Sequence, residues 1–275
     1  MNFRTPVHID PFPFRIAPQE ELLCVGSCFA DSIGRRFREE LFPATVNPFG
    51  VMYNPVSILH TVERCTVAPG VALLTLGTNH VYRLKSTGEI VDNCQKRPQS
   101  LFDEQQLTVG ECCEALSRAV SVLQARSPGV RVVLTVSPIR YAKYGFHGSQ
   151  LSKATLLLAA DRLAGQSPCC TYFPAYEIVN DELRDYRFYA PDMLHPTQQA
   201  VDYIWERLVE VAFSDEARRF LADWAPVKAA LNHRPFSPDS DGYRAFMAKT
   251  LLKVAALSEK YPKFATVYRT LKNGG

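Results

Sequence analysis

The chain alternates between short, almost continuous apolar runs and longer stretches with one apolar face. The apolar runs are typical of buried strands, and they lie at residues 22–25, 71–76, 130–136 and 171–173. The longer stretches repeat their apolar residues every third or fourth position, which predicts amphipathic helices at residues 28–41, 104–126, 152–163 and 196–213. Strands that alternate with helices predict a parallel sheet covered by helices on both faces.

The pattern changes after residue 213. Two helical stretches follow, at residues 215–232 and 238–260, and no strand-like run accompanies them. We therefore predict an α/β domain over residues 1–213 and a helical extension over residues 214–275. The first twenty residues contain four prolines and predict an extended segment.

Reactive groups of parallel sheets gather at the carboxyl ends of the strands, and the first strand ends in Gly26-Ser27-Cys28. The helix that begins there has unpaired N–H groups and a positive dipole end, which lowers the pKa of a thiol and makes it more nucleophilic. Ser27 and Cys28 are therefore both candidate nucleophiles. Alternatively, Ser27 caps the helix and Cys28 fills a tight corner.

A second candidate element is Asp192-Met193-Leu194-His195, just before a predicted helix. A carboxylate three residues before a histidine can orient the imidazole through one ring nitrogen and leave the other free as a base. His195 could equally be a capping or core residue. Only the fold can bring it to Cys28, because the two are far apart in the sequence.

Composition narrows the classes of function. The chain has 275 residues, of which 47% are apolar, which excludes a disordered protein. A net charge of +3 and the lack of a long apolar run favour neither nucleic acid nor a membrane as partner. The eight cysteines lack zinc-site spacing, and we expect reduced thiols in a cytoplasmic protein without metal or cofactor.

Several sequence words together resemble the GSCFA family of SGNH-hydrolase-like domains. The first is Gly26-Ser27-Cys28-Phe29-Ala30, which spells GSCFA. The others lie at residues 47–55 (NPFGVMYNP), 75–78 (TLGT), 93–96 (NCQK), 135–140 (TVSPIR), 152–154 (SKA), 172–178 (YFPAYEI) and 181–189 (DELRDYRFY), leading to Asp192 and His195.

The resemblance implies a flavodoxin-like three-layer α/β/α fold and an acyl-transfer enzyme, either an O-acyl esterase or an acyltransferase acting on a carbohydrate. It implies a triad in which Asp192 orients His195. The third residue of the first block is the nucleophile in the wider hydrolase family, and here it is Cys28, with Ser27 as the second choice. The implied partner is a small-molecule or carbohydrate acyl substrate.

Such folds stabilise the oxyanion with the nucleophile's own N–H, a glycine N–H and an asparagine side chain. Two sets of residues could supply the last two groups: Gly50 with Asn47 or Asn54, and Gly77 with Thr78 or Asn79. The segment Asn-Pro-Phe-Gly is also a good turn sequence. Arg140 could hold a phosphate or carboxylate of an acyl donor.

Other residues point to structural roles or to a protein with little or no catalytic activity. Arg184 and Arg187 are expected to pair with Glu182 and Asp185 around the histidine segment. Gln95 stands where the family has histidine, and residues 57–70 are shorter than the matching family segment. These departures favour the main alternative, a weakly active or inactive domain that binds an acyl-CoA, a carbohydrate or a protein. A redox pair of Cys24 and Cys28 is a third hypothesis.

Overall fold

The computed structural model describes residues 4–92, 94 and 97–273. Its central sheet contains β1 (Leu22–Gly26), β2 (Ala44–Val46), β3 (Val71–Leu76), β7 (Arg131–Val136) and β8 (Cys170–Tyr172). All neighbours in this sheet are parallel, in the order β2-β1-β3-β7-β8. This is the strand order of flavodoxin-like folds, so the predicted fold class is confirmed.

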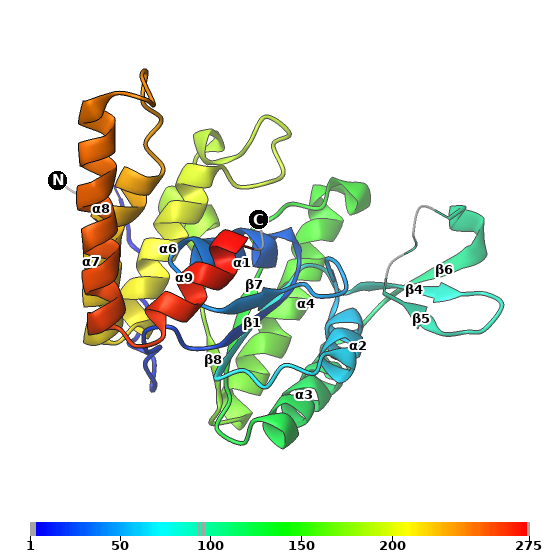
Figure 1. The fold of residues 1–275 in the computed structure, drawn as a ribbon. Helices are drawn as coiled ribbons and strands as arrows, with labels where there is room; N and C mark the ends of the chain where they lie inside the picture. Colours follow the sequence, from blue (N-terminus) through cyan, green and yellow to red (C-terminus); the bar gives the residue numbers. More distant parts are fainter. Residues whose placement is uncertain (1–3, 93, 95–96, 274–275) are drawn as a thin grey trace.

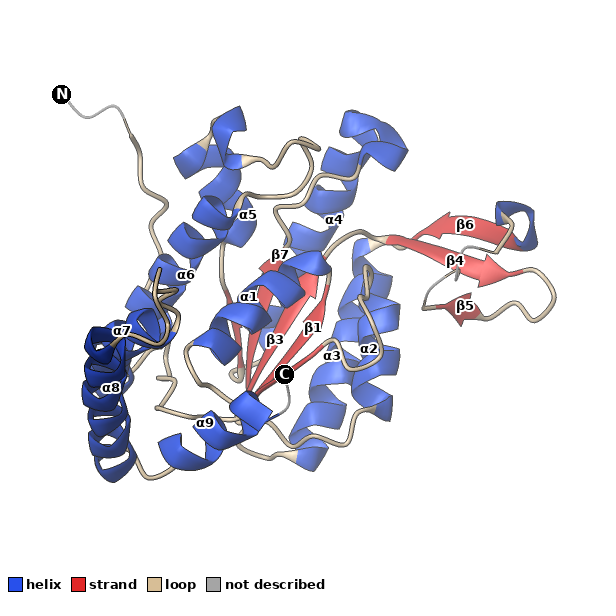
Figure 2. Ribbon diagram, turned by 45° about the horizontal axis from the view of Figure 1, so that its top comes forward, coloured by secondary structure: helices blue, strands red, loops and turns tan. Residues whose placement is uncertain are grey.

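Helices cover both faces of the sheet, as Figure 2 shows. One face carries α1 (Cys28–Glu39) and α6 (Gln198–Ala212), and the other carries α2 (Pro55–Arg64), α3 (Val109–Arg126) and α4 (Gly145–Gln166). The alternation of side chains along β1 explains the two cores. Cys24 packs with α1 and α6, whereas Leu23 and Val25 pack with the helices of the opposite face.

A small antiparallel sheet projects from the edge of the molecule and was not predicted (Figure 1). It contains β4 (His80–Leu84), β5 (Ile90–Val91) and β6 (Phe102–Gln106), in the order β5-β4-β6. We call residues 80–106 the arm. The prediction of a helix from residue 104 was wrong at its start, because α3 begins at Val109 behind a capping box formed by Thr108 and Glu111.

Short helical turns connect the larger elements. They are Gln99–Leu101, Ala142–Tyr144, α5 (Ala175–Glu177), Ile178–Leu183 and Tyr186–Phe188. Sequence periodicity missed α2 and placed the start of α4 too late. In the described part of the chain, no helix is long and apolar enough to cross a membrane.

Three helices follow the sheet domain: α7 (Asp215–Leu231), α8 (Asp241–Lys260) and α9 (Phe264–Asn273). In Figure 1, α7 and α8 lie on the side of the molecule that carries α6. Phe220 and Phe264 belong to the same apolar cluster as Phe37 of α1, and Phe220 meets Phe42 edge to face at 6.1 Å. The C-terminal helices therefore extend the hydrophobic core on one side of the sheet.

Candidate active site

A cavity of about 450 Å³ opens at the carboxyl ends of β1, β3 and β7. Cys28 lines it from the start of α1, and His195 from the loop before α6. Tyr53, Asn54 and residues 139–144 form further parts of the wall. The arm closes another side with His80, Tyr82, Val91, Asp92 and Cys94. The fold thus brings Cys28 and His195 to one cavity, although they are far apart in the sequence.

Ser27 and Cys28 take different roles at the turn from β1 to α1. Ser27 is fully buried, and its Oγ accepts a hydrogen bond from the Phe29 N–H at 3.2 Å, which caps α1. Ser27 Oγ also lies 3.4 Å from Thr75 Oγ1. Cys28 is half-buried and lines the cavity, whereas Ser27 does not line it.

Several effects act on the Cys28 thiol. Burial raises its pKa above the ordinary cysteine value, hydrogen bonding from the Tyr53 hydroxyl lowers it, and the Asp31 carboxylate raises it. The backbone N–H of Cys28, the first N–H of α1, interacts with the residue's own sulfur and so lowers the pKa of the thiol, and no other described residue accepts a hydrogen bond from it. That N–H remains available to a ligand in the cavity.

Asp192 holds His195 in a defined orientation. Its Oδ2 lies 2.6 Å from His195 Nδ1, while Oδ1 accepts from the backbone N–H groups of His195 at 3.0 Å and Leu194 at 2.9 Å. These bonds, led by the one from the His195 N–H, lower the pKa of Asp192 to about 2. The carboxylate therefore favours a proton on Nδ1 and leaves Nε2 as the base. No hydrogen bond joins His195 to Cys28, both of which are described residues.

Arg140 fixes the loop that carries His195. Its Nη1 donates to the Met193 carbonyl at 2.9 Å, and its backbone N–H donates to the Leu194 carbonyl at 3.1 Å. Its guanidinium also lies 4.0 Å from the centroid of the Phe146 ring. The structure thus gives Arg140 a role in positioning the histidine loop, in addition to its place in the cavity wall.

The two glycines predicted for the oxyanion hole already use their N–H groups. Gly50 donates to the Asn47 carbonyl at 2.9 Å, and Gly77 donates to the Tyr53 carbonyl at 3.0 Å. The Asn47 side chain accepts from the Gly26 N–H and donates to Asp31, so it organises the turn. Neither glycine nor Asn47 lines the cavity.

Asn54 and Thr78 do line the cavity, and Asn79 does not. The Asn54 Oδ1 caps α2 by accepting from the Ser57 N–H at 2.9 Å, which leaves the amide Nδ2 for a ligand. Thr78 Oγ1 pairs with Ser152 Oγ at 3.0 Å. Asn79 donates from Nδ2 to the Leu107 carbonyl at 2.8 Å and so anchors the base of the arm.

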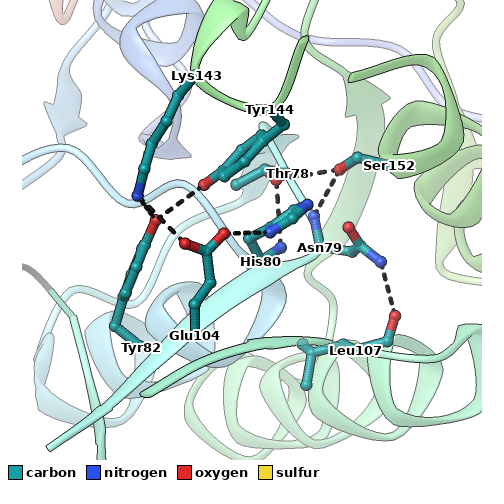
Figure 3. A network of polar contacts seen from close by, with 9 residues as sticks. All are labelled: Thr78, Asn79, His80, Tyr82, Glu104, Leu107, Lys143, Tyr144 and Ser152. Atoms are coloured by element: carbon teal, nitrogen blue, oxygen red, sulfur yellow. Dashed lines mark hydrogen bonds and ion pairs between the residues drawn. The ribbon is translucent and has the colours of Figure 1, made fainter. Parts of the chain in front are cut away.

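A polar network joins the arm to the loop after β7, as Figure 3 shows. His80 Nδ1 lies 2.6 Å from Glu104 Oε1, and Lys143 reaches the other oxygen of Glu104 at 3.3 Å. Tyr82 and Tyr144 join their hydroxyls at 3.2 Å, and the Tyr144 ring stacks on His80. The alternation of residues 80–84 could have indicated a strand here, but nothing in the sequence shows its partners.

A buried lysine, Lys153, stabilises the ends of the strands beside the cavity. The Lys153 ammonium donates to the carbonyls of Gly77 at 2.8 Å and Ser137 at 2.7 Å, which follow β3 and β7. Burial lowers the pKa of Lys153 to about 7. Lys153 therefore ties together the ends of two central strands beside the cavity.

The remaining predictions concern the ion pairs near the histidine segment, the proposed redox pair and Gln95. Arg187 pairs with Asp185 as expected, but Arg184 pairs with Asp181, and Glu182 pairs with Arg4. Cys24 is completely buried in β1, and burial raises its pKa to about 12, which disfavours redox exchange with Cys28. Gln95 lies outside the described residues.

The described residues contain no group of three or more histidine, cysteine or acidic side chains placed to hold a metal ion. Cys94 of the arm lines the cavity, but burial raises the pKa of its thiol.

The solved structures to which this chain is similar overall include three esterases. An acetyl esterase mutant with an acetate ion is 10% identical over 74% of this chain and 99% of its own, with a TM-score of 0.43. A Corynascus thermopiles (Myceliophthora fergusii) carbohydrate esterase family 2 enzyme plus carbohydrate binding domain is 12% identical, and the match covers 77% of this chain and 68% of its own, with a TM-score of 0.42. A carbohydrate esterase family 3 from Talaromyces cellulolyticus is 8% identical, and the match covers 74% of this chain and 99% of its own, with a TM-score of 0.41.

Curated proteins give no match to this sequence. Family models do match it. The model of the GSCFA family covers residues 21–69 and 66–208, and that of the C-terminal domain of GSCFA domain proteins covers residues 224–267. Together these matches extend over most of the sheet domain and the helices that follow, and the chain belongs to the GSCFA family.

Proposed function

We propose that this protein is an acyl-transfer enzyme, an O-acyl esterase or an acyltransferase with a carbohydrate substrate, acting in the cytoplasm. The observation that supports it most is the shared cavity of Cys28 and the Asp192-oriented His195, at the carboxyl ends of the parallel strands. The cavity's tyrosines support a carbohydrate, because sugar C–H faces pack well on aromatic rings.

In this mechanism the Cys28 sulfur attacks the carbonyl carbon of an ester or thioester. His195 Nε2 takes the thiol proton, and the imidazolium formed is stabilised by the Asp192 carboxylate. The acyl-enzyme is a thioester, and the leaving alcohol or thiol receives the proton back from His195. Water or an acceptor hydroxyl then attacks the thioester, which regenerates the Cys28 thiol.

Negative charge on the carbonyl oxygen needs donors in the cavity. The Cys28 N–H and the Asn54 Nδ2 are two donors in the cavity wall that could bind it. Removal of one such donor typically lowers kcat about 10²–10³-fold. His195 must also approach the thiol, which its exposed loop permits, since such contacts often tighten only when substrate binds.

The test is hydrolysis of short p-nitrophenyl esters by the wild type and by Cys28→Ala, Ser27→Ala and His195→Ala. We expect Cys28→Ala and His195→Ala to lose turnover. Ser27→Ala should keep its chemistry at a cost in stability, because the lost cap is worth about 1 kcal/mol. Unchanged turnover in both Cys28→Ala and His195→Ala would contradict the mechanism.

The alternative is a domain that binds an acyl-CoA, a carbohydrate or a protein partner without efficient turnover. The observation that favours it is the absence of a hydrogen bond between the described side chains of Cys28 and His195. Under this alternative, equilibrium titration would show binding of acyl-CoA or an acylated sugar, with no product formed. Binding would then be unaffected in His195→Ala.

A further inference from the structure

Tyr141 carries a buried hydroxyl that has no partner. Its ring lines the cavity, and its hydroxyl is enclosed without a hydrogen bond to any described residue. The rest of the residue is well held, because its N–H donates to Ser149 Oγ at 3.3 Å and the Lys153 ammonium lies 4.9 Å from the ring centroid. A buried unpaired hydroxyl is costly, so its retention needs an explanation.

This hydroxyl lies at the turn that carries Cys28. A Cβ added to Gly77 would collide with the Tyr141 hydroxyl and would stand 3.3 Å from the Ser27 Cβ, so these groups share one small space. Ser27 immediately precedes Cys28. Burial raises the pKa of Tyr141, and charge on the Cys28 sulfur raises it further, as expected of groups that lie close together.

Tyr53 completes the arrangement on the other side. Its hydroxyl lowers the pKa of the Cys28 thiol, and its ring meets that of Tyr141 edge to face, with centroids 6.1 Å apart. Two phenol rings thus line the same cavity as Cys28, and the hydroxyl of Tyr141 has no hydrogen-bond partner among the described residues. That hydroxyl needs an acceptor that the neutral thiol does not provide.

We propose that Tyr141 is a catalytic residue that donates a hydrogen bond to the Cys28 sulfur when the thiol ionises. The inference rests on the proposed function, in which Cys28 is the nucleophile. The S–H bond breaks, the proton passes to His195 Nε2, and the sulfur keeps the electron pair. A thiolate is a much stronger acceptor than a thiol, so the Tyr141 bond stabilises the ionised form selectively.

The test measures the pH dependence of Cys28 alkylation by iodoacetamide, which needs no substrate. Alkylation forms a sulfur–carbon bond and releases iodide, and peptide mass spectrometry separates Cys28 from Cys94. We expect Tyr141→Phe to raise the apparent pKa of Cys28 by about one unit, with about tenfold less thiolate at any pH below it. Tyr189→Phe is the matched control, because Tyr189 lies near Arg140 but outside this cavity, and it should leave that pKa unchanged.

Thermal unfolding separates this role from a structural one. Tyr141→Phe removes no hydrogen bond of the resting protein, so its melting temperature should not fall. An unchanged Cys28 pKa in Tyr141→Phe would overturn the proposal, whatever the melting temperature. If Tyr141→Phe did not fold, Tyr141→Leu would be measured against the same two outcomes. Failure here would leave the proposed function intact, since that depends on the Cys28→Ala and His195→Ala turnover.

Discussion

Two regions of very different construction meet at the cavity. The end of the central sheet supplies Cys28, Asn54 and the groups beneath them, held by buried helix caps and by Lys153. The arm supplies the opposite wall from short antiparallel strands, and most side chains of β6 are exposed. The first region has a large hydrophobic core on each side. The second contributes Val81 to one of these cores and is also held by polar contacts, such as those of Glu104 and Asp92.

This difference in construction suggests that the sheet end carries out the reaction and that the arm determines which substrate is accepted. Groups on a rigid, buried scaffold can hold reacting atoms in place, which is what nucleophile and oxyanion donors require. Residues on an exposed arm can be substituted with little loss of core stability. Such a region can therefore determine which acyl group or acceptor the protein accepts. We therefore expect substitutions at the sheet end to alter rate or stability, and substitutions on the arm to alter substrate preference.

The largest effect should come from the histidine loop. His195→Ala should lower kcat about 10²–10⁴-fold with little change in melting temperature, because the side chain is about half exposed. The pKa of Asp192 is lowered to about 2, so this carboxylate stays ionised at any working pH. A wild-type rate in His195→Ala would remove the base from the mechanism.

The next effect concerns stability at the sheet end. The pKa of Lys153 is lowered to about 7 by burial, so between pH 7 and its unfolded value the unfolded chain binds more protons, and stability rises with pH. Between about pH 6.5 and 8 this adds about 1 kcal/mol to the free energy of unfolding. Urea denaturation should show this rise in the wild type and not in Lys153→Met.

Lys253→Met provides the control for that measurement, since Lys253 is exposed on α8. It should keep the wild-type dependence on pH. Cysteines and tyrosines also contribute to the pH dependence of the free energy of unfolding, and comparing each variant with the wild type cancels their contribution. An equal rise in Lys153→Met and wild type would show that Lys153 does not titrate in this range.

The smallest effect should come from the arm. Glu104→Gln weakens the pairing with His80 and Lys143, so it should change kcat/KM a few-fold for bulky acyl esters and hardly at all for acetyl esters. Asp103→Asn is the control, because Asp103 is the neighbouring, exposed residue of β6. A large loss on acetyl esters in Glu104→Gln would mean that the arm takes part in the chemistry.

Sequence reasoning succeeded where a pattern is local. Apolar runs located β1, β3, β7 and β8 of the central sheet but not the short β2, and the block at residues 26–30 pointed to Cys28 at the turn into α1, where it lines the cavity. The arm escaped prediction because β5 has only two residues and β6 is polar, so their pairing with β4 is a tertiary effect.

The oxyanion groups show the same limit. Gly50 and Gly77 were plausible donors, but whether an N–H is free depends on which carbonyl folds onto it. Tyr141 carried no motif, and only the enclosure of its hydroxyl beside Gly77 marks it. Hydrogen-bond partners distant in sequence cannot be read from residue types alone.

The most direct test of the account is to trap the acyl-enzyme. The protein would be quenched in acid during turnover of p-nitrophenyl acetate, and the peptide containing Ser27 and Cys28 would be fragmented by mass spectrometry. We predict one acetyl group on the Cys28 sulfur, released by neutral hydroxylamine as a thioester is, and none in Cys28→Ala. An acetyl group on Ser27 Oγ, or full turnover in Cys28→Ala, would contradict the central claim.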